Sequence, residues 1–306
     1  MIPENILKKK VLEITKNKTI LDLILKINNL EIQGARNVAL TSIDILEIYY
    51  SENGLDENFF KLAKLLKEIR PTQVITYNVV SIIEKSIEKK GISIFKELRD
   101  ILYSAQEKID LNLLKELINF GKNRITILTH CHSSEEIRAL IFAKDYGIDL
   151  VVYVTETRPK YQGIKTAKEL SEAGVKVKYI VDSAAGFYIR NVDLALFGCD
   201  AIRREGIINK IGTYMISLAA KDNNKEVWFI GDHLKIDLRK ELIIEMRDSK
   251  EIIDPKLLPN VEILNPAFDL TPWRLIDKAI TDLGVFGSFE ELLSKFRIKY
   301  STYSTK

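Results

Sequence analysis

The chain has 306 residues, of which 46% are hydrophobic, so it is long enough for two domains or one large domain with a substantial core. The 46 lysines and arginines nearly balance 43 acidic residues, and this small excess disfavours an extended nucleic-acid surface. Two cysteines make no disulfide framework, and neither a long apolar run nor a secretion signal is present, so we expect a soluble, cytoplasmic protein without a membrane partner.

The first 120 residues are predicted to form a helical domain. They hold only three of the 14 glycines and are rich in leucine, isoleucine, lysine and glutamate at helical spacing. Apolar residues at intervals of up to four build one helix stripe, formed by Phe60, Leu62, Leu65, Leu66 and Ile69. Pro71 is placed to start the next helix, with Thr72 in its first turn. We expect about five or six helices over 1–120.

From Arg124 the pattern changes to short β-branched runs that alternate with amphipathic stretches. The expected strands are Ile125–Leu128, Leu150–Val154, Val175–Val181, Val192–Phe197, Val227–Ile230, Leu242–Ile244 and Val261–Leu264. Helical patterns lie between the early strands, at about 134–146, 163–173 and 210–222. Continuous apolar strands that alternate with helices are typical of a parallel sheet covered on both faces. We therefore predict a Rossmann-like α/β domain with a mainly parallel sheet over 121–306.

Polar clusters follow six of the expected strands. They are Thr129-His130-Cys131-His132, Thr155-Glu156-Thr157-Arg158, Asp182-Ser183, Gly198-Cys199-Asp200, Gly231-Asp232-His233 and Asn265-Pro266. Ligands of open α/β sheets bind at the carboxyl ends of the strands. Six polar clusters at one edge predict a crevice there.

The expected ligand is a small phosphorylated metabolite. Ser133 and Glu136 form a capping-box pattern, so the helix after Cys131 is expected to present free N–H groups, which attract anions. Arg158 and Lys210 lie near two other loop–helix junctions and would add positive charge. No G-x-G-x-x-G follows a strand and no G-x-x-x-x-G-K-[ST] is present, which disfavours a dinucleotide or a nucleoside triphosphate. No cofactor is expected.

The residues also suggest a proton carrier, with simpler alternatives open. Cys131 could supply a thiolate, because a helix N-terminus and a nearby cation lower the pKa of a thiol. Asp200 could be the complementary acid if the crevice is apolar enough to raise its pKa. Alternatively, Cys131 is a packing residue and Asp200 a cap or turn residue. His130 and His132 point to opposite sides of an extended chain, which disfavours a shared metal ion, and Cys199 reads as a small core residue.

These motifs resemble a superfamily that contains archaeal ribose-1,5-bisphosphate isomerase, methylthioribose-1-phosphate isomerase and the alpha, beta and delta regulatory subunits of translation initiation factor 2B. The resemblance covers nearly the whole chain, densely from 125 to 275 and sparsely before 120. The ribose-1,5-bisphosphate isomerase branch is favoured by E-T-R-P-K-x-Q-G at Glu156–Gly163 and by E-M-R-D at Glu245–Asp248. The other matching segments are Thr129–Ser133, Ile180–Ala185, Ile208–Thr213, Asn265–Pro272, Gly34-Ala35 and Arg70–Thr72.

The resemblance implies an aldose–ketose isomerase that acts on a ring-closed sugar 1-phosphate, first of all ribose 1,5-bisphosphate to ribulose 1,5-bisphosphate. In the family mechanism an aspartic acid at the position of Asp200 assists ring opening. A cysteine at Cys131 moves a proton from C2 to C1 through a cis-phosphoenolate. The same carry-over implies that phosphates and hydroxyls are held by Gly34, Ala35, Arg70, Ser133, Arg158, Asn209, Lys210 and Lys235. Arginine and lysine are the residue types that two phosphate groups require.

Some positions depart from the family pattern. Gln33 stands where the isomerases usually carry the arginine of R-G-A, which would weaken phosphate binding unless Arg36 reaches in. Cys199 replaces a commoner alanine, Arg203–Gly206 replaces a less charged turn, and Asp232-His233 stands where an aromatic residue is expected. These differences leave the exact sugar phosphate open.

A non-catalytic regulatory subunit is the alternative from another functional class, because Gly206–Tyr214 also resembles the regulatory alpha subunit. Methylthioribose-1-phosphate isomerase is a second alternative. A regulator needs neither a thiol nor a carboxylate at the two strand ends, so the presence of both Cys131 and Asp200 favours the enzyme. The resemblance further implies a homo-oligomer, either a dimer or a trimer of dimers.

Overall fold

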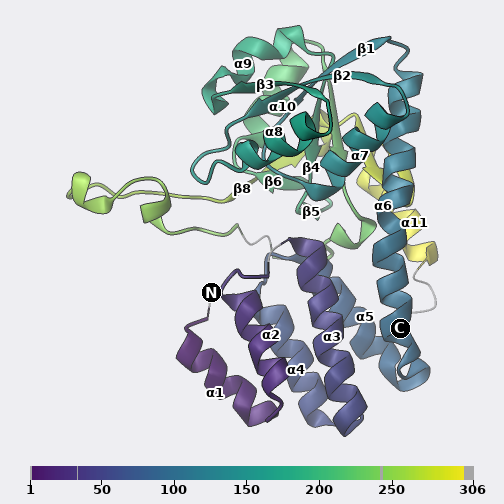
Figure 1. Ribbon diagram of the computed structural model, residues 1–306, viewed down its shortest axis with the longest axis vertical. Coiled ribbons are helices and arrows are strands. Elements are labelled where there is room, and N and C mark those ends of the chain that lie inside the picture. The colour runs from purple at the N-terminus through teal and green to yellow at the C-terminus, as the bar shows by residue number, and fades with distance from the viewer. Residues whose placement is uncertain (1, 33, 242–243, 300–306) are drawn as a thin grey trace. The chain divides into compact units, whose positions relative to one another are not determined.

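The computed structural model describes residues 2–32, 34–241 and 244–299 (Figure 1). The chain forms two compact units. The first extends to Ser104 and includes the described residues after Phe296, and the second is Ala105–Phe296. Gln33 and two residues of the expected strand Leu242–Ile244 lie outside the described residues. In the described part of the chain, no helix combines the length and the apolar character needed to cross a membrane.

The first unit is built from helices. In the described residues up to 120 there are six, which agrees with the expected number: α1 Glu4–Ile14, α2 Lys18–Asn28, α3 Ala35–Asn53, α4 Glu57–Ile69, α5 Val74–Lys90 and α6 Ser93–Asn119. Helix α6 continues past Ser104 into the second unit.

Helix α4 shows how local sequence sets these helices, and it corrects two expectations. Asp56 caps the helix by accepting a hydrogen bond from the backbone N–H of Phe59 at 2.8 Å. Phe59 is fully buried and Phe60 is 37% exposed, so the apolar stripe begins one residue earlier than predicted. Pro71 does not start a helix; it lies in a turn, and α5 begins at Val74.

The second unit contains a seven-stranded sheet in the order β10-β9-β7-β4-β1-β2-β3. All neighbouring strands in it are parallel except β9 and β10, which confirms the predicted mainly parallel α/β fold. Its strands are β1 Arg124–Thr129, β2 Asp149–Thr155, β3 Lys176–Ile180, β4 Leu194–Gly198, β7 Glu226–Ile230, β9 Lys278–Thr281 and β10 Gly284–Phe286. A second, antiparallel sheet consists of β5 Ala201–Ile202, β6 Gly206–Lys210 and β8 Phe268–Pro272.

Both faces of the large sheet are buried because alternate residues of each strand enter different cores. In β1, Ile127 joins a core with α6, α7 and α8, whereas Leu128 joins a core with α9, α10 and α11. The helices of this unit are α7 Ser134–Asp145, α8 Gln162–Glu172, α9 Ala185–Tyr188, α10 Thr213–Asp222 and α11 Phe289–Lys299. Burial on both faces explains why the strands read as continuous apolar runs.

Five of the seven expected strands are present, with bounds within two residues or so of those predicted. The described part of the expected strand at 242–244 is irregular, and Val261–Leu264 is irregular as well. Val261 is 54% exposed and Leu264 is 63% exposed, so their side chains lack the packed surface that stabilises a strand. The expectation of strands here was wrong because apolar composition alone does not supply a partner strand.

Candidate active site

The strand order brings two of the polar clusters together. Strand β1 pairs with β2 on one side and with β4 on the other, so the order of strands reverses between β1 and β4. In an open α/β sheet, the carboxyl ends of the strands at such a reversal form the ligand crevice. Cys131 follows β1 and Asp200 follows β4, and each keeps part of its surface exposed. A small ligand can therefore reach both residues.

Five of the six polar clusters follow strands of this sheet at its carboxyl edge. The sixth, Asn265-Pro266, follows no strand. Asn265 instead donates from its side-chain nitrogen to the carbonyl of Asp248 at 2.9 Å, and Pro266 pairs with Met246. These contacts close the base of an excursion of the chain between β7 and β8.

The backbone of Cys131 is held in an unusual conformation. Its φ is +78°, a left-handed value that costs energy in a residue with a side chain. Its N–H donates to Thr157 Oγ1 at 2.9 Å, and its carbonyl accepts from Thr166 Oγ1 at 2.8 Å. Thr157 also has a positive φ, +61°, and its N–H donates to Asp182 at 2.7 Å. Threonine hydroxyls thus fix both polar groups of the Cys131 backbone.

The thiol of Cys131 is protonated in the free protein. Burial, together with the Asp200 carboxylate, raises its pKa to about 12, and Lys210 acts in the opposite direction. The expectation of a lowered thiol pKa was therefore wrong. Loss of water around the thiolate and the negative charge of Asp200 outweigh the cation and the helix terminus.

Asp200 has the raised pKa that its proposed role requires. Burial raises its pKa to about 6, with Glu135 and Glu245 acting in the same direction and Lys235 and Lys210 opposing it. Its backbone N–H donates to the carbonyl of Ile208 at 2.8 Å, which fixes the residue at the start of β5. Asp200 can hold or release a proton near neutral pH.

The start of α7 differs from the expected capping box. Ser133 Oγ accepts from the backbone N–H of Glu136 at 3.4 Å, which is one half of the motif. The Glu136 carboxylate does not return to Ser133; it accepts from the Thr129 hydroxyl at 2.5 Å and from the Gly198 N–H at 2.9 Å. A Cβ on Gly198 would lie 2.3 Å from Ser133 Cβ, so only glycine lets α7 approach β4 this closely. The Glu136 carboxyl group therefore joins α7 to the ends of β1 and β4 and does not complete the cap.

Two lysines lie near the pair. Lys235 is buried and its ammonium forms an ion pair with Glu135 at 2.6 Å. Lys210 is only 5% exposed, and in the described part of the chain its ammonium has neither a hydrogen-bonded nor an ion-paired partner. Its charge lowers the pKa of both Cys131 and Asp200. Asn209, also buried, donates to the Thr213 hydroxyl at 3.1 Å.

The remaining predicted phosphate ligands are placed as follows. Arg158 stacks on the ring of Tyr161 at 5.0 Å, bonds to its hydroxyl, and donates to the carbonyl of Ile252 at 3.2 Å, so its guanidinium is engaged within the protein. Gly34, with a φ of +84°, precedes α3, and Ala35 is the first residue of that helix. Arg70 is the C-cap of α4. A role for these three in substrate binding stays a prediction.

The histidines of the first cluster bind different partners. His130 Nδ1 lies 2.6 Å from the Thr155 hydroxyl and its Nε2 lies 2.8 Å from the Ile211 carbonyl. His132 Nε2 lies 3.2 Å from Glu169. Burial lowers the pKa of both imidazoles, which favours their neutral forms. They tie the strand end to its neighbours.

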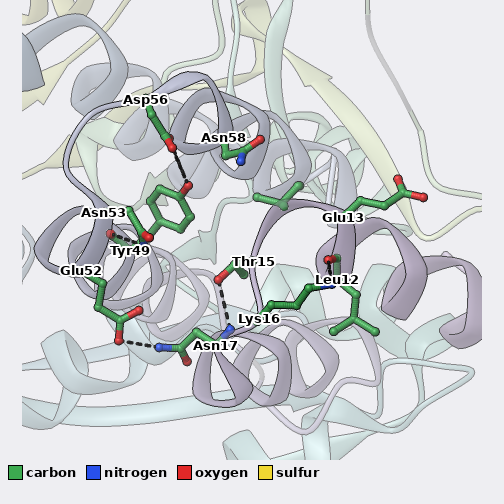
Figure 2. A pocket seen from close by; sticks show the side chains of 11 residues that line it. Leu12, Glu13, Thr15, Lys16, Asn17, Tyr49, Glu52, Asn53, Asp56 and Asn58 are labelled. Carbon is green, nitrogen blue, oxygen red and sulfur yellow. Dashed lines mark hydrogen bonds between the residues drawn. The ribbon is translucent and has the colours of Figure 1, made fainter.

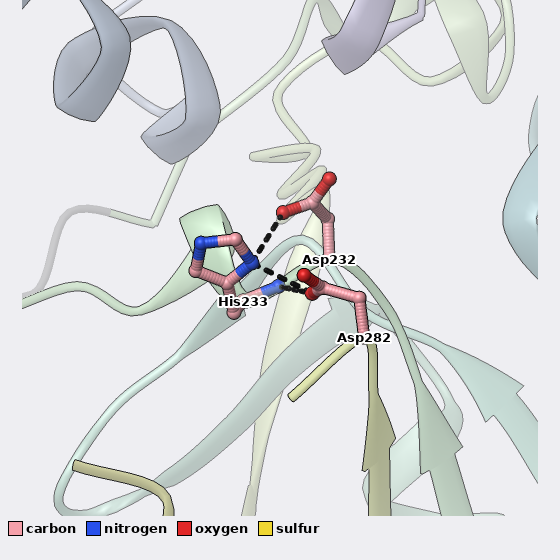
Figure 3. Close-up of side chains that lie close together, drawn as sticks. All are labelled: Asp232, His233 and Asp282. Carbon is pink, nitrogen blue, oxygen red and sulfur yellow. Dashed lines mark hydrogen bonds and ion pairs between the residues drawn. The ribbon is translucent and has the colours of Figure 1, made fainter. Parts of the chain in front are cut away.

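Sequence reasoning did not identify a buried trio at the end of β7 and β9 (Figure 3). His233 Nδ1 lies 2.6 Å from Asp282 and 3.3 Å from Asp232. Three ligand atoms of the trio lie within 4.8 Å of one another, a spacing that could hold a metal ion. Asp282 also accepts from the His233 backbone N–H at 3.0 Å, so the trio already forms a bonded cluster that fixes the turn before Lys235. Asp282 belongs to no recognisable sequence motif, and it lies beside His233 only because β7 pairs with β9.

A cleft of about 600 Å³ lies in the first unit, near the turn between α1 and α2 (Figure 2). Its polar side chains already bond one another: Asn17 donates to Glu52 at 2.7 Å, and the Tyr49 hydroxyl donates to Asp56 at 3.0 Å. Burial and then this bond raise the pKa of Tyr49 to about 12. The one lysine among the lining residues, Lys16, bonds the Leu12 carbonyl at 2.9 Å. The one cation of the cleft is exposed to solvent, and the polar groups named here already bond within the protein.

A family model, described as the initiation factor 2 subunit family, matches residues 31–288. The chain belongs to this family.

Individual relatives of the chain include named isomerases. The ribose 1,5-bisphosphate isomerase of Thermococcus kodakarensis is 36% identical over 292 residues, which cover 88% of this chain and 91% of that protein. The crystal structure of 5-methylthioribose 1-phosphate isomerase from Pyrococcus horikoshii is similar with a TM-score of 0.71 and 27% identity, covering 91% of this chain and 88% of that one. Translation initiation factor eIF-2B of the same organism gives a TM-score of 0.77 over 90% and 99% of the chains; at 24% identity this likeness shows the fold alone.

Proposed function

We propose that the chain converts ring-closed ribose 1,5-bisphosphate to ribulose 1,5-bisphosphate. The observation that supports this most is Lys210. Its side chain is 5% exposed, its ammonium has no bonded partner among the described residues, and its charge acts on both Cys131 and Asp200. A phosphate oxygen would supply a partner for this ammonium. An anionic substrate beside a proton-transferring pair accounts for all three residues.

The proposed reaction has two proton carriers. Asp200 donates its proton to the ring oxygen as the C1–O4 bond breaks, while the Cys131 thiolate removes the C2 proton. These steps give a cis-phosphoenolate with a C1–C2 double bond. Asp200 then takes the proton of the C2 hydroxyl as the ketone forms, and the Cys131 thiol returns its proton to C1. Each carrier ends in its initial state, and no external acid or base is consumed.

The proposed scheme requires one proton transfer within the free protein, from the Cys131 thiol to the Asp200 carboxylate. At neutral pH the thiol holds a proton and Asp200, with a pKa of about 6, is mainly ionised. The reactive form has the proton on Asp200 and the charge on Cys131, with the same total charge. Because each group's charge raises the pKa of the other, the two titrate as a coupled pair. Protonation of Asp200 makes the thiol easier to ionise.

The relatives support an isomerase over a regulatory subunit. The relative with 36% identity is named an isomerase, whereas the initiation factor structure is similar at the level of the fold. The likeness to 5-methylthioribose 1-phosphate isomerase keeps that substrate as the alternative. Both substrates are sugar 1-phosphates, so the same Cys131 and Asp200 chemistry applies to either.

The test is to incubate the purified protein with ribose 1,5-bisphosphate and follow the formation of ribulose 1,5-bisphosphate. We expect turnover by the wild type, and a loss of at least about 100-fold in kcat for Cys131→Ser and for Asp200→Asn. Cys199→Ser is the matched control for thiol substitution and should retain most activity. Turnover that survives both active-site substitutions would refute the mechanism. If ribose 1,5-bisphosphate and methylthioribose 1-phosphate are both inert with the wild type, the regulatory alternative replaces the isomerase.

The homo-oligomer implied by the resemblance is tested separately, by light scattering at micromolar concentration. A monomeric mass would contradict it.

A further inference from the structure

A buried ion pair connects two segments that lie 100 residues apart in the chain. The Lys235 ammonium and the Glu135 carboxylate are 2.6 Å apart, and their side chains are 5% and 6% exposed. Such a pair is weak evidence for stability, because the cost of removing both charges from water offsets their attraction. Its position suggests a different purpose.

The pair lies against the segment that carries Asp200. Strands β4 and β7 are paired so that Gly198 is opposite Ile230, which places Cys199-Asp200 beside Gly231. A Cβ on Gly231 would lie 2.4 Å from Cys199 Sγ and 3.5 Å from Lys235 Nζ. The Lys235 ammonium therefore packs on the backbone next to Cys199, immediately before Asp200.

Glu135 reaches the same place from the opposite direction. It lies in the first turn of α7, and this turn contacts the end of β4 at Gly198. The Glu135 carbonyl accepts a hydrogen bond from the side-chain nitrogen of Gln106 at 3.0 Å, which anchors the turn to α6. The first turn of α7 therefore places the Glu135 carboxylate against the Lys235 ammonium.

Buried acids hold Lys235 in place. It ends a 3-10 turn, His233–Lys235, in which Asp232 accepts the Leu234 N–H at 2.8 Å. Asp282 accepts the His233 N–H at 3.0 Å and lies 2.6 Å from its Nδ1 (Figure 3). The turn is therefore fixed by side chains, and the lysine cannot easily withdraw from the site.

Charged groups from several elements face Asp200. Lys235 after β7 and Lys210 at the end of β6 favour its ionised form. Glu135 in α7 and Glu245 after β7 favour its protonated form. The thiols of Cys131 and Cys199 complete the surroundings. In this set, only Glu135 touches one of the lysines.

We propose that Glu135 is a positioning residue that holds the Lys235 ammonium and partly neutralises it, so that Asp200 keeps the proton that it donates to the ring oxygen. This inference rests on the proposed isomerase function. Without the Glu135 charge, Lys235 would stabilise the Asp200 carboxylate and reduce the fraction of protein with the acid form. Lys235 then serves as a charge partner within the protein.

The experiment compares pH profiles of kcat/KM for the wild type and Glu135→Gln with ribose 1,5-bisphosphate. Glutamine keeps the shape and an oxygen acceptor for Lys235 but removes the charge. The profile of kcat/KM reports the ionisation of the free enzyme. The reactive form has the same total charge as the form that dominates above the pKa of Asp200, so kcat/KM falls below that pKa, and we expect this acid limb to move about one pH unit lower. Because the lower pKa also makes the reactive form scarcer, kcat/KM should fall about tenfold at pH 7.5 and about twofold at pH 5.

The matched control is Glu116→Gln. Glu116 binds Lys278 at 2.7 Å, an ion pair at the first residue of β9 and thus at the amino edge of the sheet. This substitution removes a similar charge far along the strands from Asp200, and its profile should coincide with that of the wild type. Lys235→Met is the opposing variant and should move the acid limb to higher pH.

The outcomes separate this inference from the proposed function. If the wild type turns over, the role of Glu135 is overturned by either of two results. The kcat/KM profile of Glu135→Gln could coincide with that of the wild type, or it could be lower by the same factor at every pH. A wild type without turnover refutes the isomerase. In that case a carboxyl NMR titration of Asp200 still decides the electrostatic claim, because the pKa of Asp200 should be lower in Glu135→Gln. An unchanged titration would reject it.

Discussion

Replacing Gly231 by alanine should destabilise the second unit through one specific contact. The new Cβ would lie 2.4 Å from Cys199 Sγ and 3.3 Å from Lys235 Cδ. Non-bonded heavy atoms pack at about 3.5–4.0 Å, so the sulfur contact requires a shift of more than about 1 Å between β4 and β7. Crowding of this kind in a packed core costs about 1–3 kcal/mol. The Lys235 side chain can yield by a few tenths of an ångström, so Cys199 determines the cost.

The decisive variant is Gly231→Ala combined with Cys199→Ala. Cys199→Ala alone removes a small buried group and should cost about 1 kcal/mol. In the double variant the added methyl group occupies the space of the missing sulfur. We therefore expect the double variant to be more stable than Gly231→Ala alone, with a coupling free energy of about 1–2 kcal/mol.

Urea unfolding of the four proteins measures this coupling. Both tryptophans, Trp228 and Trp273, belong to the second unit, so their fluorescence reports the unit that contains the substitution. Additive effects of the two substitutions, or a Gly231→Ala protein as stable as the wild type, would refute the packing argument.

Three further predictions follow from buried polar groups. Thr166→Val removes the hydroxyl that binds the Cys131 carbonyl, and it should lower the unfolding free energy by about 1–3 kcal/mol and reduce kcat. The control Thr41→Val removes a surface bond to Asn37 and should lower the unfolding free energy by less than about 0.5 kcal/mol. Equal losses of unfolding free energy in the two variants would contradict this prediction. Arg203→Met removes a side chain that is 2% exposed and binds Asp237 at 2.7 Å, and urea unfolding should show a loss of about 3–5 kcal/mol in unfolding free energy. In the control Arg204→Met, the lost ion pair with Glu290 has side chains that are both 65% exposed, and the loss should be about 0–1 kcal/mol. Burial raises the pKa of Glu136 from 4.5 to about 8, so between these values the folded state binds a proton that the unfolded state releases. The contribution of this group to stability should therefore be greatest below pH 4.5 and decrease as the pH rises to 8. The decrease should be at most about 1.4 kcal/mol per pH unit. Glu136→Gln should show a shallower decline over the same range, and identical slopes would exclude Glu136 as the source.

The parallel sheet could be predicted from the sequence because its strands are buried on both faces. Runs such as Leu150–Val154 and Val227–Ile230 are apolar at every position, and both form strands. The small antiparallel sheet was not predicted. Its strand β6 reads Gly-Ile-Ile-Asn-Lys, too short and too mixed to distinguish from the start of a helix. Its existence depends on pairing with β8, which lies some 60 residues later.

The candidate site was predictable where it depends on strand ends and not where it depends on strand order. Cys131 and Asp200 each follow a recognisable apolar run, so the general rule for α/β sheets selects them. The ion pair of Glu135 with Lys235 requires knowledge that β4 lies between β1 and β7, which the sequence does not encode locally. The raised pKa of Cys131 was missed for a similar reason, since burial and the charge of Asp200 depend on the assembled fold.

The reversal of strand order at β1 and β4 gives the two proposed proton carriers separate supports. The Cys131 backbone is tied to Thr157 and Thr166, on the side of β2 and α8, whereas the Asp200 backbone is tied to Ile208 in β6. In the proposed reaction both residues act in both steps, so substitutions around α8 would act through the position of Cys131 and substitutions around β6 through that of Asp200. Each member of the pair can therefore be repositioned without direct change to the hydrogen bonds that hold the other.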